Sequence, residues 1–149
     1  MNSTLEYLEA IKNMTSKMKA PSIEGIVLEH GRPFVSPAQA RPKGIRKGED
    51  RMCFMNSYHL AMQTGWTYVE GFAISDVVPI PLHHAWVIDR AGMVIETTWE
   101  TAGVEYYGIP LDTSFMHKVM LETKRYGILD PYSPSFRKRY LTRLDTVIV

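Results

Sequence analysis

The stretch that most constrains the fold is HHAWVIDRAGMVIETTW, residues 83–99. Two segments rich in β-branched and aromatic residues, roughly 83–89 and 93–99, flank the tripeptide RAG at 90–92. This pattern is typical of two strands joined in a β-hairpin. A three-residue hairpin loop commonly ends in a residue with positive φ, and Gly92 suits that position.

The length of the loop decides which side chains of the hairpin meet. A three-residue loop pairs Asp89 with Met93, so the numbers of paired residues sum to 182 and even-numbered residues share one face. Trp86 then lies opposite Glu96, and His84 lies diagonally from the same glutamate, about 7–8 Å away at the backbone. We therefore expect the Glu96 carboxylate to contact one nitrogen of the His84 imidazole and to stabilise its charged form. A loop of two or four residues would break this pair.

The chain has one cysteine, Cys53, which excludes an intramolecular disulfide and a multi-cysteine zinc site. It lies in the first turn of a helix that we expect within 48–65, with Asp50 as N-cap and Gly65 just after its end. A lone cysteine is most often a small buried hydrophobe. Yet a thiol becomes a nucleophile as the thiolate, which a helix N-terminus and an adjacent imidazolium both favour. The cysteine, the hairpin histidine and its glutamate are therefore candidate catalytic residues.

Cys53 at a helix start, HAWVID at 84–89 and VIETTW at 94–99 resemble the transglutaminase-like cysteine enzymes of the broad papain-like group. In that family a cysteine on a helix precedes a His-Ala-Trp strand, and an acidic residue lies on the next strand. The resemblance covers about a third of the chain. It implies acyl chemistry in which Cys53 attacks a carbonyl, His84 transfers protons and Glu96 orients the imidazole. The family usually has aspartate at the last position, and many members have a Gly-x-Cys pattern that this chain lacks.

Two further parts of such a site have candidates in the sequence. An oxyanion hole needs positioned N–H donors, which the backbone of Cys53, the side chain of Asn56 or that of Gln39 could supply. Most aromatic residues of this region should lie in the core, but a few could wall a substrate groove, with Trp86, Trp99 and Tyr68 as candidates.

No metal and no cofactor are expected. A metal site built from His59, His83, His84 and Glu96 lacks an HExxH or similar pairing. We interpret His83, on the face opposite to its neighbour, as a partly buried or surface histidine. Glu70, in an apolar strand, is expected at an edge or facing solvent.

The order of the other expected elements indicates an α+β fold: an antiparallel sheet with helices packed on one side, and a papain- or transglutaminase-like core. A Ser3–Glu6 capping box precedes the first helix. Asp112 and Gly127 bound the last. The expected elements are a helix at 4–19, a short strand at 25–29, a long loop at 31–50, strands at 66–74 and 104–111, a helix at 113–126 and a strand at 146–149.

The 149 residues fit a single domain. We divide it into an N-terminal helix and loop (1–47), a catalytic-like core (48–127) and a C-terminal tail (128–149). No membrane span or signal peptide is apparent, so a cytoplasmic protein is expected. The net charge of +1 gives no general attraction to nucleic acid. The two basic runs are interpreted as solvated loops; they contain Arg41, Lys43, Arg46 and Lys47, and Arg137, Lys138, Arg139 and Arg143.

The sequence therefore favours a cysteine-dependent peptidase, amidase or deamidase acting on a protein or peptide. One alternative is a non-catalytic module of the same fold that holds a protein or nucleic-acid partner. Another is an acyltransferase with the same triad. The compact size would also suit a phage or mobile-element protein. The substrate and the oligomeric state are left open.

Overall fold

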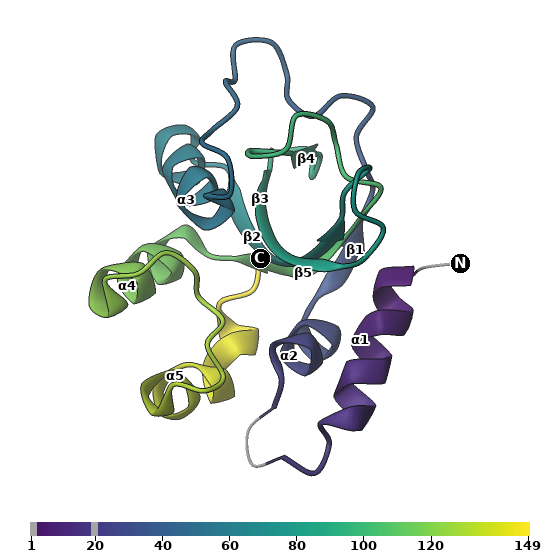
Figure 1. The fold of residues 1–149 in the computed structure, drawn as a ribbon. Helices are drawn as coiled ribbons and strands as arrows, with labels where there is room; N and C mark the ends of the chain where they lie inside the picture. Colours follow the sequence, from purple (N-terminus) through teal and green to yellow (C-terminus); the bar gives the residue numbers. More distant parts are fainter. Residues whose placement is uncertain (1–2, 19–20) are drawn as a thin grey trace.

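The structure is a computed structural model that describes residues 3–18 and 21–149. Its centre is a five-stranded antiparallel sheet with the strand order β1-β5-β2-β3-β4. The sheet curls so that one face is concave, and the long loop before α3 arches over its open side (Figure 1). The strands are β1 (Arg32–Phe34), β2 (Thr67–Ile74), β3 (Leu82–Ile88), β4 (Val94–Ile95) and β5 (Glu105–Leu111).

All helices pack against the convex face of the sheet (Figure 1). The larger core cluster joins helical residues to outward-facing strand residues, whereas the smaller cluster lies inside the curl and contains no helical residue. The expected α+β class, with helices on one side of an antiparallel sheet, is thus confirmed. The helices are α1 (Ser3–Met14), α2 (Ile23–His30), α3 (Cys53–Thr64), α4 (Thr113–Thr123) and α5 (Pro134–Arg139), followed by the 3₁₀ helix η1 (Leu141–Thr146).

Two glycines face each other where the sheet curls. Gly71 on β2 pairs with Gly108 on β5, and Gly71 also pairs with His84 on β3. A Cβ atom on Gly71 would lie 2.2 Å from the Tyr107 carbonyl oxygen, and one on Gly108 would lie 2.8 Å from the Trp86 ring. The missing side chains therefore let the strands close around the indole, beside the histidine.

The β3–β4 hairpin has the register that the sequence predicts. Val87 pairs with Ile95, and the Asp89 N–H donates to the Met93 carbonyl at 3.0 Å, so paired numbers sum to 182. Gly92 has a φ of 81°. The Asp89 carboxylate accepts hydrogen bonds from two backbone N–H groups of the loop, each at 2.9 Å, which fixes the loop at three residues.

The second strand of the hairpin is shorter than the expected 93–99. It ends at Ile95 because the chain then bonds to the long loop instead of continuing the ladder. The Glu96 N–H donates to the Ala40 carbonyl, and the Gly48 N–H donates to the Thr97 carbonyl, both at 2.8 Å. The predicted loop at 31–50 is confirmed apart from β1, and it supplies these bonds.

Near the N-terminus the expected strand at 25–29 is wrong, because these residues belong to α2. Ser22 caps this helix, and its Oγ accepts from the Gly25 N–H at 2.9 Å. Helix α1 ends at Met14, short of the expected 19, which lies outside the described residues. The Glu105 carboxylate accepts hydrogen bonds from the backbone N–H groups of Ser3 and Thr4 at the start of α1, in place of the expected Ser3–Glu6 capping box.

Helix α3 begins at Cys53, later than expected. Asp50 is not its cap: the N-cap position is Met52, without a side-chain hydrogen bond, and the Asp50 carboxylate pairs with Lys47 instead. Gly65 ends the helix with a φ of 74°, as predicted.

For the remaining strands and the C-terminal part, some predictions from the sequence are confirmed and others are wrong. The strands at 66–74 and 104–111 are confirmed to within one residue. Asp112 caps α4 as expected, but the helix ends at Thr123, before Gly127. The expected strand at 146–149 is reduced to one bridge between Leu111 and Ile148.

Candidate active site

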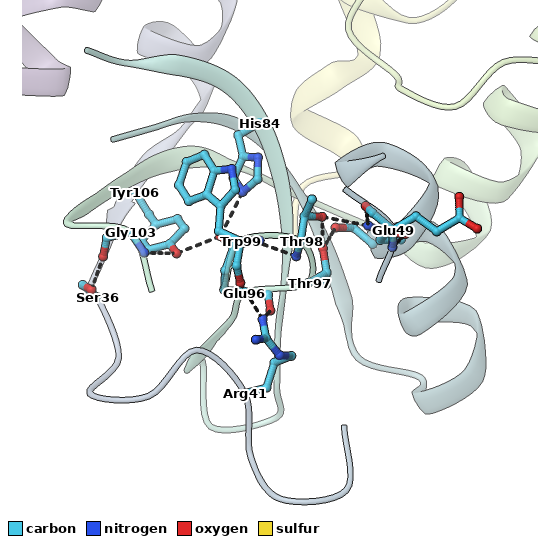
Figure 2. A network of polar contacts seen from close by, with 12 residues as sticks. Ser36, Arg41, Glu49, His84, Glu96, Thr97, Thr98, Trp99, Gly103 and Tyr106 are labelled. Atoms are coloured by element: carbon cyan, nitrogen blue, oxygen red, sulfur yellow. Dashed lines mark hydrogen bonds and ion pairs between the residues drawn. The ribbon is translucent and has the colours of Figure 1, made fainter. Parts of the chain in front are cut away.

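The hairpin brings the predicted histidine and glutamate together. The His84 Nε2 and the Glu96 Oε1 lie 2.9 Å apart, and both residues are almost fully buried (Figure 2). The two side chains meet on the concave face because the register places them diagonally across the hairpin. The contact that the loop length predicts is therefore present.

Three other groups complete the hydrogen bonds of the Glu96 carboxylate. The Tyr106 hydroxyl donates to Oε1 at 2.9 Å, and the backbone N–H groups of Thr98 and Trp99 donate to Oε2 at 2.9 Å each. Burial by itself would raise the pKa of Glu96, but the bonds from His84 and the two N–H groups lower it. The carboxylate thus stays ionised inside the protein.

The state of His84 follows from its two partners. Burial would lower the pKa of this imidazole, but hydrogen bonds with the Cys53 thiol and the Glu96 carboxylate outweigh burial and raise it to about 9. Because the carboxylate occupies Nε2, the nitrogen left for the thiol is Nδ1. The Trp99 indole covers the ring face to face, with centroids 3.9 Å apart and planes 6° apart.

Cys53 is the first residue of α3 and is partly exposed. The N–H groups of a first helical turn have no partner within the helix, so the sulfur lies at the positive end of the helix dipole. Two residues earlier, Arg51 has a φ of 66°, a left-handed conformation that turns the chain sharply into the helix.

Arg41 holds the turn that carries Glu96. Its guanidinium donates to the carbonyls of Glu96, Trp99 and Glu100 at 2.6, 2.8 and 3.1 Å (Figure 2). The interpretation of this residue as part of a solvated basic loop is therefore wrong. Three carbonyls attract one guanidinium because its fixed fork of N–H donors matches their spacing in the turn.

Two oxyanion-hole candidates have other positions or partners. Both Nδ2 hydrogens of Asn56 are used, on the Glu49 carbonyl at 2.8 Å and the Thr98 hydroxyl at 2.9 Å, so this amide fastens the loop to the turn. Gln39 is exposed and lines a hollow together with Asp89, Met93 and Ile95, and neither Cys53 nor His84 lines this hollow. The backbone N–H of Cys53 remains as a donor.

The three residues predicted to wall a substrate groove differ in their exposure to solvent. Trp99 is half-buried and lines an open groove. Trp86 and Tyr68 are fully buried and cannot wall a groove: the indole packs inside the curl against Tyr106, and the phenol donates to Glu70 at 2.6 Å.

The expectation for Glu70 is wrong, because this carboxylate is fully buried. It accepts from the Tyr68 hydroxyl, from His83 at 3.2 Å and from the backbone N–H groups of Ile128 and Leu129 at 2.7 and 2.9 Å. It therefore fastens the segment after α4 to the sheet. His83 is partly buried, as interpreted.

The four residues of the alternative metal site do not come together: His84 bonds Glu96, whereas His83 bonds Glu70. His59 interacts with Tyr126, far along the chain from both histidine–glutamate pairs. Within residues 3–18 and 21–149, no group of three or more His, Cys, Asp or Glu side chains is arranged to hold a metal ion.

Sequence reasoning did not assign Tyr106 or Arg41 to the site. Tyr106 is one of several aromatic residues in the chain, and nothing in the sequence marks it as a donor to Glu96. Arg41 lies 55 residues from that glutamate in the chain, so no local pattern connects them.

Comparisons with protein-family models, with curated proteins and with solved structures find no match to this chain. In the described residues, every helix is too short or too polar to cross a membrane. The site must therefore be interpreted from its own features: a thiol at a helix start, an imidazole whose pKa that thiol helps to raise, and a buried carboxylate that bonds the imidazole.

Proposed function

We propose that this protein is a cysteine-dependent enzyme that cleaves an amide or peptide bond with a Cys53–His84–Glu96 triad. The observation that carries the proposal is the position of His84: its Nε2 lies 2.9 Å from the Glu96 carboxylate, which leaves Nδ1 for the Cys53 thiol, and this thiol helps to raise the pKa of the ring. In cysteine hydrolases this arrangement provides a thiolate beside an imidazolium.

The first half of the reaction forms an acyl-enzyme. The Cys53 thiolate attacks the carbonyl carbon, a C–S bond forms, and the carbonyl electrons move to oxygen. The backbone N–H of Cys53, at the start of α3, is a donor to this oxyanion. The intermediate then collapses, the C–N bond breaks, and His84 gives its Nδ1 proton to the departing amine.

The second half frees the enzyme. The now neutral imidazole of His84 takes a proton from water, whose oxygen attacks the thioester carbon. Collapse of this intermediate breaks the C–S bond and releases a carboxylic acid, and the thiolate–imidazolium pair is restored. An amine in place of water would give acyl transfer by the same steps. Glu96 holds the ring in one tautomer throughout.

We propose a protein or peptide as the substrate and the cytoplasm as the compartment. A single cysteine that must stay reduced to act as a nucleophile suits a reducing compartment. A module that only binds a partner would not need a thiol in contact with a buried, charged imidazole.

The test is the rate of alkylation by iodoacetamide as a function of pH. Because Cys53 is the only thiol, every label reports on the site, and Cys53→Ser is the blank. At pH 6 only about 0.3% of free cysteine is thiolate, so we expect Cys53 to react at least about tenfold faster than free cysteine. His84→Ala should remove this advantage.

The neighbouring histidine provides a matched control. His83 also bonds a buried glutamate, but through the other face of the sheet. We expect His83→Ala to keep the fast rate at pH 6. A slow, ordinary thiol in the wild-type protein, or equal losses in the two variants, would contradict the proposed function and favour the binding module.

A further inference from the structure

An open groove with a volume of about 660 Å³ lies beside the triad, and we call it the side groove. Residues of three segments line it: 47–51, 75–82 and 98–101. The first segment leads to the thiol, the second leads to the histidine, and the third follows the glutamate. Each wall of the groove thus comes within two residues, along the chain, of one member of the candidate triad.

Trp99 connects the side groove to the reacting groups. Its indole is stacked on the His84 imidazole, and the same residue lines the groove. Opposite it, the Thr101 hydroxyl donates to the Asp76 carboxylate at 2.7 Å, which ties the second wall to the third. A ligand bound in the side groove would thus contact the Trp99 indole, which is itself stacked on the His84 imidazole.

The rest of the lining favours an apolar ligand. Val77, Val78 and Leu82 add aliphatic surface to the indole, and Val77 is 82% exposed. A valine this exposed next to other apolar groups is typical of a binding surface.

The charges of the side groove nearly cancel. Lys47 pairs with Asp50, and the remaining charged residues in the lining are Arg51, Asp76 and Glu100. The excess of one negative charge does not attract an acidic ligand and leaves apolar contact as the main source of affinity.

From these observations we infer that the side groove binds a large apolar side chain of a peptide substrate, next to the carbonyl that Cys53 attacks. This inference rests on the proposed function and adds the substrate class: peptides with a residue such as leucine at the cleavage point. A free peptide is the occupant, because an open groove with walls from three loops can admit an extended chain.

The experiment compares three chloromethyl ketones on the full chain: N-acetyl-leucyl, N-acetyl-glycyl and N-acetyl-aspartyl. Each reacts in the same way, since the thiolate forms an S–C bond and chloride leaves. We expect the leucyl probe to label Cys53 at least about tenfold faster than the glycyl probe, and the aspartyl probe to be slowest. Equal leucyl and glycyl rates, or a fastest aspartyl probe, would overturn the inference.

A matched pair of valines tests the location. Val77 lines the side groove and Val35, 80% exposed, does not. We expect Val77→Asp to reduce the leucyl preference several-fold and Val35→Asp to leave both this preference and the iodoacetamide rate unchanged. A preference that both variants keep would place the apolar site elsewhere and contradict the inference.

The two proposals fail in different ways. An ordinary rate with iodoacetamide would remove the proposed function, and the substrate class with it. A fast iodoacetamide rate without leucyl preference would remove only the substrate class.

Discussion

The buried carboxylates of Glu96 and Glu70 accept hydrogen bonds from the same kinds of donor. Each buried carboxylate accepts from one histidine, one tyrosine hydroxyl and two successive backbone N–H groups. The histidines, His84 and His83, are neighbours and point to opposite faces of β3. His84 also has a nearby thiol, Cys53, that helps to raise its pKa. Glu70 can therefore serve as an internal control for the role of Glu96.

The first prediction uses this pair. Glu96→Gln and Glu70→Gln both place an amide against two backbone donors, so each should lower the free energy of unfolding by about 1–3 kcal/mol. Only Glu96→Gln should also reduce alkylation of Cys53 at pH 6, by about tenfold or more, because it removes the charge that keeps His84 protonated. Urea denaturation and alkylation, measured on both variants, check this. Equal rates in the two variants would show that Glu96 is merely structural.

A second prediction concerns Arg41. Arg41→Gln removes a guanidinium that holds three carbonyls of the Glu96 turn, so we expect the fast alkylation to shift toward higher pH. Lys43→Gln, an exposed residue of the same basic run, should leave the pH profile in place. A lower yield of folded protein with an unchanged profile would assign Arg41 to stability alone.

The ring stacked on His84 gives a third prediction. Trp99→Ala removes an aromatic face from an imidazolium, whereas Trp99→Phe keeps a face in place. We expect the pKa of His84 to fall in the alanine variant and to change less in the phenylalanine variant. Nuclear magnetic resonance titration of the histidine ring protons measures it. An unchanged pKa in the alanine variant would contradict a role for the indole.

A fourth prediction is the dependence of stability on pH. The pKa of His84 is about 9 in the folded chain and 6.5 for an unperturbed histidine. Protonated His84 therefore stabilises the fold fully below pH 6.5, and this contribution is lost as the pH rises through about 9. Urea midpoints between pH 6 and 9.5 should decline over this window in the wild-type protein and in His83→Gln. They should decline less in His84→Gln, and parallel curves for all three would contradict the raised pKa.

The sequence predicts the parts of this molecule that depend on neighbours in the chain. The hairpin register follows from a three-residue loop, and the contact of His84 with Glu96 follows from the register. The end of α3 follows from Gly65. Each of these requires fewer than fifteen residues of context.

What the sequence did not predict depends on distant partners. Residues 25–29, GIVLE, are a short apolar run that resembles a strand, but Ile26 and Val27 belong to a helix that packs against strand residues of the sheet. Glu70 is polar in an apolar strand, and only the segment at 128–129 shows why it can be buried. Such contacts join residues far apart in the chain, so periodicity cannot reveal them.

The loop between β3 and β4 limits how this chain can vary. Arg90 and Ala91 are exposed and can be exchanged freely, since the Asp89 carboxylate and Gly92 make the turn. An insertion or deletion of one residue there would instead move the Glu96 side chain to the opposite face of the sheet. A descendant of this chain could keep all three triad residues and still lose the site through a single codon gained or lost.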